Sequence, residues 1–336
     1  MQRSLLRPLL RILRSRPRKL SLALQGGGSH GAFTWGVLDR LLEEDILVDG
    51  VSGASAGALN AAALVDGWSR NGREGAREAL ERLWQTISRT LQGTPARSTP
   101  LDYLLSGWNR DLSPGFLFLN RLTHLASPYA LNPSGYNPIT DIAEDVFDME
   151  RLNRSDGIRL FVSMTDVRSG ELALRRNGAI NADVLAASAC LPLLFQAVEI
   201  DGRPYWDGGY TGNPALYPLL FECRARDIYL VQFTPADCQQ APRRVNDIVA
   251  RAREIAFHAN LSRERAFVEM LQQQGPGWFG LRRWRPRLHR IESGESMQGL
   301  GSSSRLNTEW AFLCHLRDLG RQHMDNWLQG QAGEGP

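Results

Sequence analysis

The sequence predicts one α/β domain built on a parallel sheet. Strand and helix patterns alternate in the order of an apolar run at 20–24, a glycine-rich loop, a helix with one apolar face, a second apolar run at 46–48 and an Ala-rich helix at about 56–65. Parallel neighbours need a crossover helix, so this order predicts a parallel sheet with right-handed crossovers. At 336 residues and 43% hydrophobic, the chain can bury one large core.

Composition excludes several classes of protein. The net charge is only +3, so no general surface for nucleic acid is expected. No apolar run is long enough to cross a bilayer. We expect a cytoplasmic protein with reduced thiols and neither a zinc site nor a disulfide framework, because no Cys-x-x-Cys pair occurs among Cys190, Cys223, Cys238 and Cys314.

Residues 1–19 form a basic amphipathic segment, in which leucines alternate with arginines and no acidic residue occurs. Such a segment can lie on the anionic inner face of a membrane, where each basic residue contributes about 1 kcal/mol. A targeting peptide and a solvated, disordered leader are the alternatives.

The domain is expected to continue to residue 329. Residues 73–92 predict an amphipathic helix that ends at Gly93. Residues 94–138 lose this periodicity and mix prolines with aromatic residues, which we interpret as an apolar cap over a site. The later elements expected are strands at 158–164, 171–174 and 227–233, helices at 182–189, 243–272 and 303–329, a hairpin turning at Asp201-Gly202, and a disordered tail at 330–336.

A serine stands between two glycines in Gly53-Ala54-Ser55-Ala56-Gly57, where an apolar run meets the Ala-rich helix. This spacing is typical of a nucleophile on a tight strand-to-helix turn, because small neighbours let the backbone bend and expose the hydroxyl. The amides of the following helix favour negative charge that develops at the serine. We predict that Ser55 forms an acyl-enzyme, which water then hydrolyses.

The loop Gln25-Gly26-Gly27-Gly28-Ser29-His30-Gly31 has two interpretations. Gly26, Gly28 and Gly31 fit a dinucleotide fingerprint with Asp49 as the ribose-binding acid, which favours a Rossmann-type NAD(P)-dependent oxidoreductase. Alternatively, the amides of Gly26, Gly27, Gly28 and Ser29 surround an oxyanion, and His30 is a candidate for substrate contact. Only the second interpretation gives Ser55 and Asp207 a role.

Hydrolysis also needs a base. Asp207 stands on a tight turn with Gly208 and Gly209, which can hold a carboxylate against a neighbouring loop. A Ser-His-Asp triad would instead use His258 or His289, which both follow Asp207 as α/β-hydrolases require. We favour Asp207 as the proton acceptor, because His258 belongs to a helical pattern and His289 to a strand pattern.

Together, Gly26 to Gly31, Gly53 to Gly57 and Asp207 to Gly209 resemble the patatin-like phospholipases over about residues 20–235. The resemblance implies a three-layer α/β/α sandwich with a mainly parallel central sheet, lipid acyl hydrolase activity and no cofactor or metal. It assigns Ser55 as nucleophile, Asp207 as proton acceptor and Gly26 to Ser29 as the oxyanion hole. Many members carry Arg or Lys where this chain has His30.

The sequence therefore predicts a carboxylic ester hydrolase with a lipid substrate, a Ser55/Asp207 dyad and no nucleic-acid partner. A lipid-binding scaffold without activity is an alternative from a different class of protein. The second alternative is the NAD(P)-dependent oxidoreductase described above.

Overall fold

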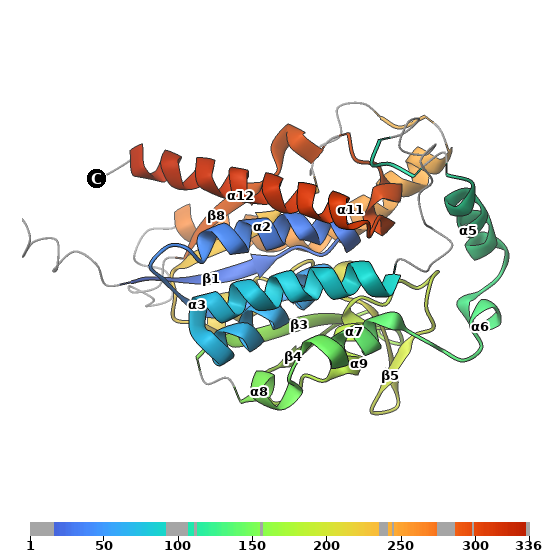
Figure 1. Cartoon of the computed structure of the whole chain (residues 1–336), viewed down its shortest axis with the longest axis horizontal. Helices are drawn as coiled ribbons and strands as arrows, with labels where there is room; N and C mark the ends of the chain where they lie inside the picture. The colour runs from blue at the N-terminus through green and yellow to red at the C-terminus, as the bar shows by residue number, and fades with distance from the viewer. Residues whose placement is uncertain are drawn as a thin grey trace, which may run out of the picture.

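A computed structural model describes residues 17–91, 107–110, 113–154, 157–234, 241–243, 245–273, 286–297 and 299–333. Within them, a sheet of eight strands runs in the order β5-β6-β3-β2-β1-β7-β8, with β4 beside β3 (Figure 1). The neighbours that run parallel are β3 (Arg159–Asp166), β2 (Ile46–Ala54), β1 (Arg18–Leu24), β7 (Asp227–Gln232) and β8 (Arg287–Glu292). The antiparallel additions are β4 (Leu172–Arg176), β5 (Val198–Ile200) and β6 (Arg203–Asp207).

Helices cover both faces of this sheet. One face carries α2 (Gly31–Leu41), α3 (Ala56–Leu91) and α12 (Trp310–Gly333), and the other carries α10 (Tyr217–Glu222) and α11 (Val245–Gln273). The core divides in the same way: Leu22 and Leu24 of β1 belong to the cluster on the first face and Ala23 to the cluster on the second. Successive strand residues point to opposite faces, so one strand supplies both cores. The predicted three-layer sandwich with a mainly parallel sheet is confirmed.

The insertion predicted over residues 94–138 is partly helical. It contains α5 (Pro114–Leu125), α6 (Pro128–Leu131) and the first residue of α7 (Pro138–Val146). Each of these helices begins with a proline, which fits the first helical position because no intrahelical bond is lost there. Two short helices, α8 (Met149–Asn153) and α9 (Ala182–Ser188), complete this side of the molecule.

The ends of the domain differ from the sequence-based expectation. β1 begins at Arg18, so the segment predicted at 1–19 overlaps it, and residues 1–16 lie outside the described residues. The helix expected at 303–329 begins only at Trp310, after a separate 3-10 turn, η4 (Ser302–Leu306). The two are separate because the backbone of Asn307 is extended, and the side-chain amide of Asn307 donates to the Trp108 carbonyl. The helix from Trp310 continues to Gly333, so the prediction of a disordered tail from residue 330 is wrong for residues 330–333. No helix among the described residues is long and apolar enough to cross a membrane.

The helices α2 and α12 lie against each other without space for side chains at two points. A Cβ at Gly36 of α2 would overlap the carbonyl oxygen of Arg317, and a Cβ at Gly320 of α12 would overlap the carbonyl oxygen of Phe33. Glycine at each point lets the backbones approach. This contact fixes the C-terminal helix beside the helix that follows the glycine-rich loop.

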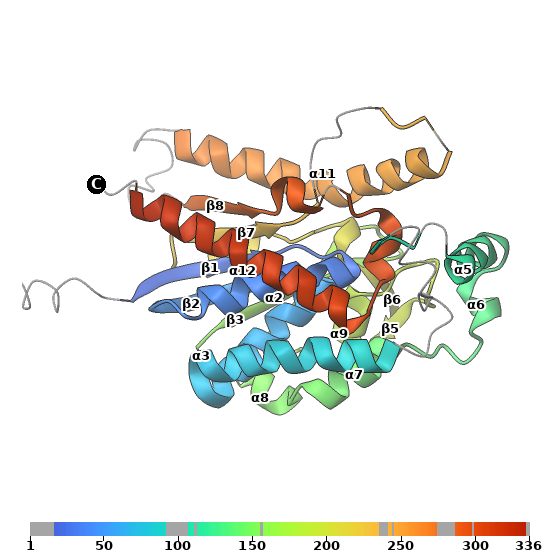
Figure 2. The same cartoon turned by 45° about the horizontal axis from the view of Figure 1, so that its top comes forward.

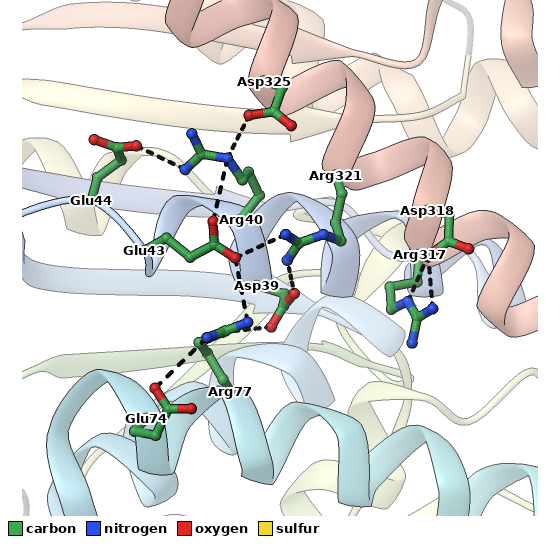
Figure 3. A network of polar contacts seen from close by, with 10 residues as sticks. All are labelled: Asp39, Arg40, Glu43, Glu44, Glu74, Arg77, Arg317, Asp318, Arg321 and Asp325. Atoms are coloured by element: carbon green, nitrogen blue, oxygen red, sulfur yellow. Dashed lines mark hydrogen bonds and ion pairs between the residues drawn. The ribbon is translucent and has the colours of Figure 1, made fainter.

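Ion pairs surround this glycine contact at the surface (Figure 3). Arg40 of α2 bonds Glu44, in the turn after that helix, and Asp325 on α12, and Arg321 of α12 pairs with Asp39 of α2 and with Glu43 in the same turn. Arg77 of α3 also pairs with Asp39 and Glu43, so the network joins three helices. Partly exposed pairs contribute about 0 to 1 kcal/mol each, so the network orients the helices more than it stabilises them.

We expect Gly320→Ala to lower the free energy of unfolding by about 2 to 3 kcal/mol, because the new methyl group overlaps the Phe33 carbonyl. Gly330→Ala in the same helix is the matched control. Its Cβ meets no atom within 4 Å, so it should stabilise the protein by up to about 1 kcal/mol through helix propensity. Urea unfolding measures both changes, and equal effects of the two substitutions would refute the close contact.

Candidate active site

Ser55 occupies a strained turn between β2 and α3. Its φ is 53°, a left-handed conformation that costs a serine about 1 to 2 kcal/mol. The backbone is held there because its N–H donates to Ser188 Oγ at 3.0 Å and its carbonyl accepts from the Ala58 amide at 2.9 Å. The side chain stands at the carboxyl end of β2 and at the amino end of α3, as the sequence predicts for a nucleophile.

The glycine-rich loop lies directly against this turn. A Cβ at Gly26 would overlap the carbonyl oxygen of Ala54 and approach the Ser55 Cβ to 2.8 Å. On the other side, a Cβ at Gly57 would overlap the carbonyl oxygen of Leu24. Both motifs therefore need glycine for the same reason, which is the close approach of two backbones.

Sheet register brings Asp207 to the same place. In the pairing of β2 with β3, Ala54 stands opposite Ser163, and in the pairing of β3 with β6, Met164 stands opposite Asp207. Ser55 directly follows Ala54 on one side of β3, and Asp207 lies on the other side of β3, one position further along. Both residues therefore stand at the carboxyl edge of the sheet. The structure brings together the serine and the aspartate that the sequence analysis selected.

The Asp207 carboxyl is buried, with only 1% of the residue exposed. Its Oδ1 accepts the Gly209 amide at 2.7 Å, and its own backbone N–H donates to the Cys190 carbonyl at 2.8 Å. Burial raises the pKa of this carboxyl to about 7, while the Gly209 amide and the Ser55 hydroxyl act in the opposite direction. Among the described residues, Oδ2 has no hydrogen-bond partner of regular geometry, so the contact with the Ser55 hydroxyl is not yet a well-formed bond.

The four amides predicted to form an oxyanion hole are not equivalent. The Gly26 amide donates to Asn213 Oδ1 at 2.7 Å, so Gly26 positions the loop. Gly28 and Ser29 lie in η1 (Gly28–His30), and the first N–H groups of a helical segment have no intrahelical acceptor. The N–H groups of Gly28 and Ser29 therefore have no acceptor within η1 itself.

The histidines named from the sequence have other partners. His30 bonds Ser304 Oγ at 2.8 Å, and burial together with the Arg305 charge lowers its pKa to about 3. His289 bonds the Asp227 carboxylate at 2.7 Å, and Asp227 stands at the amino end of β7, opposite to the edge where Ser55 lies. His258 is buried in α11, where burial lowers its pKa. In the described parts of the chain, no hydrogen bond joins these histidines to Ser55 or Asp207.

Asp49, the candidate ribose ligand, is used within the fold. It is buried in the first half of β2, where its carboxylate accepts the amides of Arg224 and Ala225 and pairs with Lys19 at 2.9 Å. These partners hold the carboxyl pKa below its usual value. The side chain therefore has a structural role, which removes the support that Asp49 gave to the dinucleotide interpretation.

Three residues that support the site were not selected from the sequence. Ser188 holds the Ser55 amide, Asn213 holds the Gly26 amide, and the Arg305 carbonyl lies where a Cβ of Gly28 would be. Asn213 precedes a proline and Ser188 lies in an Ala-rich helix, so neither carries a motif. Their roles depend on contacts between distant parts of the chain.

Comparison with known proteins finds one family. A family model described as patatin-like phospholipase matches residues 22–220, which include Ser55, Asp207 and the glycine-rich loop. No curated protein matches the chain.

Solved structures of bacterial proteins are similar at low identity. VipD from Legionella pneumophila is 17% identical over 93% of this chain and 67% of its own, with a TM-score of 0.41. The type III effector ExoU is 18% identical over 94% of this chain and 53% of its own, with a TM-score of 0.32. The structure of the ExoU-SpcU complex of Pseudomonas aeruginosa is 14% identical over 94% of this chain and 52% of its own, with a TM-score of 0.35. This chain spans about half the length of the ExoU chains.

Replacing Asp207 with asparagine should stabilise the protein at high pH. The pKa of the Asp207 carboxyl is about 7 in the folded protein and 3.8 in the unfolded chain, so the folded state binds the proton more tightly. The stability of wild type therefore falls as pH rises from about 4 to 7. The neutral amide avoids this loss, which is on the order of 4 kcal/mol at pH 8.

Thermal unfolding at pH 5 and pH 8 measures this difference. Asp201→Asn is the control, because its side chain is 90% exposed and should give the same shift at both pH values. A pH-independent effect of Asp207→Asn would mean that the Asp207 carboxyl titrates normally.

Proposed function

The chain belongs to the patatin-like phospholipase family, and we propose that it hydrolyses lipid esters through an acyl-enzyme on Ser55. One observation carries this proposal: a serine held in a left-handed turn lies beside a buried carboxyl whose pKa is raised to about 7. A base with a pKa near the working pH combines a large deprotonated fraction with a useful affinity for the proton.

In the first half of the proposed reaction, Ser55 Oγ attacks the carbonyl carbon of the ester while Asp207 takes the hydroxyl proton on Oδ2. The carbonyl oxygen becomes an oxyanion, which the amides of Gly27 to Ser29 stabilise at the positive end of a helical segment. Each such donor is typically worth about 3 to 4 kcal/mol in the transition state. The bond to the leaving alcohol then breaks, and Asp207 returns the proton to it.

In the second half, water attacks the acyl-enzyme. Asp207 accepts a proton from the water, and the same amides stabilise the second tetrahedral intermediate. The bond from the carbonyl carbon to Ser55 Oγ then breaks, Asp207 returns the proton to Oγ, and the free acid is released. No histidine or metal takes part in either half. Asp207 therefore acts first as base and then as acid in each half of the reaction.

We propose that the α5 and α6 region forms a wall of the acyl-chain site. The Tyr129 hydroxyl accepts the Ala197 amide at 3.3 Å, and the Gln196 amide donates to the Asn132 carbonyl at 2.6 Å. Gln196 in turn accepts the Cys190 thiol through its carbonyl, and the Cys190 carbonyl accepts the Asp207 amide. This chain of contacts supports the interpretation of residues 94–138 as a cap, although residues 94–106 lie outside the described residues.

Contact of residues 1–19 with an anionic membrane stays a prediction, since residues 1–16 also lie outside the described residues.

We expect Ser55→Ala and Asp207→Asn each to lower kcat for a soluble short-chain ester by at least about 10³-fold, because the dyad acts as a unit. Both variants should remain folded by circular dichroism. In wild type, kcat/KM should rise with pH and level off above about pH 7, where Asp207 is deprotonated.

His258→Gln and His289→Gln are the matched controls, and each should keep kcat within about threefold of wild type. An active Asp207→Asn enzyme, or a histidine variant as inactive as Ser55→Ala, would overturn the dyad in favour of a triad. Wild type without any esterase activity would favour a lipid-binding scaffold.

A further inference from the structure

The long helix α11 is apolar on two sides. Its inner side is used by the fold: Leu261 and Val268 belong to the core cluster on that face of the sheet, and His258 is buried. The Glu264 carboxylate accepts the amides of Leu216 and Tyr217, which ties the helix to the start of α10. These contacts hold α11 in place without any contribution from its outer side.

The outer side of α11 nevertheless carries a stripe of apolar residues, each at least 40% exposed. We call this the outer stripe, and it consists of Val245, Ile248, Val249, Ile255, Phe267 and Met270. Most of these positions repeat at intervals of three and four, and the exposed alanines at 252, 256 and 266 extend the same pattern. Between residues 256 and 266 the exposed residues are Ser262 and Arg263, so the stripe has one apolar part toward each end of α11. Exposed apolar groups gathered in this way on a surface helix indicate a contact with another apolar phase.

The outer stripe lies close to the proposed base. On the inner side of the same helix, the Phe257 ring packs on Tyr210 with centroids 4.5 Å apart, and it fills the space that a Cβ of Gly209 would need. The Gly209 amide holds Asp207, so only the thickness of the helix separates the stripe from the loop of the base. Both views place the first turns of α11 at the same end of the molecule as α5 and α6 (Figures 1 and 2).

The end of the molecule that holds α5 and α6 is also apolar at its surface. Phe118 and Leu125 of α5 are 65% and 84% exposed, and Tyr129 of α6 is 58% exposed. Aromatic side chains with one polar end are common where proteins meet the interface of a bilayer. Exposed apolar groups therefore occur at the same end of the molecule on the first turns of α11 and on the wall proposed for the acyl chain.

Exposed arginines beside the stripe fit the phosphate groups of an anionic bilayer. Among the described side chains of α11, the exposed charged residues are Arg253, Arg263 and Glu269, although the helix over its whole length carries four arginines and four acidic residues. A helix with an apolar stripe and flanking arginines is typical of a segment that lies in the plane of an anionic bilayer.

We propose that the outer stripe of α11 docks on the surface of an anionic lipid bilayer, with the loop of Asp207 beneath the first half of the helix. This inference rests on the proposed function, because the lipid ester would be drawn from the same bilayer. Docking here requires no contribution from residues 1–16.

Flotation of the full-length protein with vesicles tests the proposal. Wild type should bind vesicles of phosphatidylcholine and phosphatidylserine more tightly than vesicles of phosphatidylcholine alone. Ile248→Ser/Val249→Ser should lower the partition coefficient about tenfold, because two aliphatic side chains no longer leave water. Leu47→Ser is the matched control: Leu47 is 43% exposed in β2 and is not part of the outer stripe, so binding should not change.

Phe267→Ser/Met270→Ser provides a second test at the other end of the stripe, with the same expected direction. All three variants should hydrolyse a soluble short-chain ester as wild type does, which shows that the site is intact. Wild-type binding by both double variants, or no binding by wild type, would overturn the proposal. So would a wild-type dimer that the double variants convert to monomers, since the stripe would then join two copies. Vesicle binding by a wild type that hydrolyses no ester would refute the proposed function and leave the docking surface in place.

Discussion

Burial of the Asp207 carboxyl is the constraint on which the rest of the site depends. Among the described residues no ion pair forms with this carboxylate, which is therefore costly in an apolar setting. The Gly209 amide and the Ser55 hydroxyl offset only part of this cost, so the pKa stays near 7. The surrounding fold must offset the free-energy cost of removing this carboxylate from water. It does so through β3, whose pairing with β2 on one side and β6 on the other fixes the serine and the aspartate at neighbouring positions. A left-handed serine and a buried carboxyl both reduce stability, and the close-packed sheet supports both.

Local chemistry explains why much of this could be predicted from the sequence. Sharp turns and close backbone approaches require glycine, so the loops around Gly26, Ser55 and Asp207 carry visible motifs. The alternation of strands and helices over the first 65 residues also predicts a parallel sheet, in which the carboxyl ends of neighbouring strands share one edge.

Contacts between distant segments explain what could not be predicted. Asn213 and Ser188 look ordinary in sequence, yet each holds one backbone amide of the site through a single side-chain oxygen. The C-terminal third lies outside the family match at 22–220, but the Arg305 carbonyl packs on Gly28 and Ser304 bonds His30. Burial keeps His30 neutral, so this position offers no fixed positive charge to a substrate head group. Contacts between distant parts of the chain produce no periodicity or spacing in the sequence, so these roles could not be predicted from it.

The central claim is that the buried Asp207 carboxyl, and no histidine, activates Ser55. The most direct measurement is the rate at which a fluorophosphonate probe labels wild type, Ser55→Ala and Asp207→Asn, followed by intact-mass spectrometry across pH 5 to 9. The account predicts a single adduct on wild type that forms faster as pH rises through about 7, and no adduct on Ser55→Ala. Labelling of Asp207→Asn should be slower than wild type by at least about 10²-fold above pH 7 and should not rise through that range. Labelling of Asp207→Asn at the wild-type rate would contradict it.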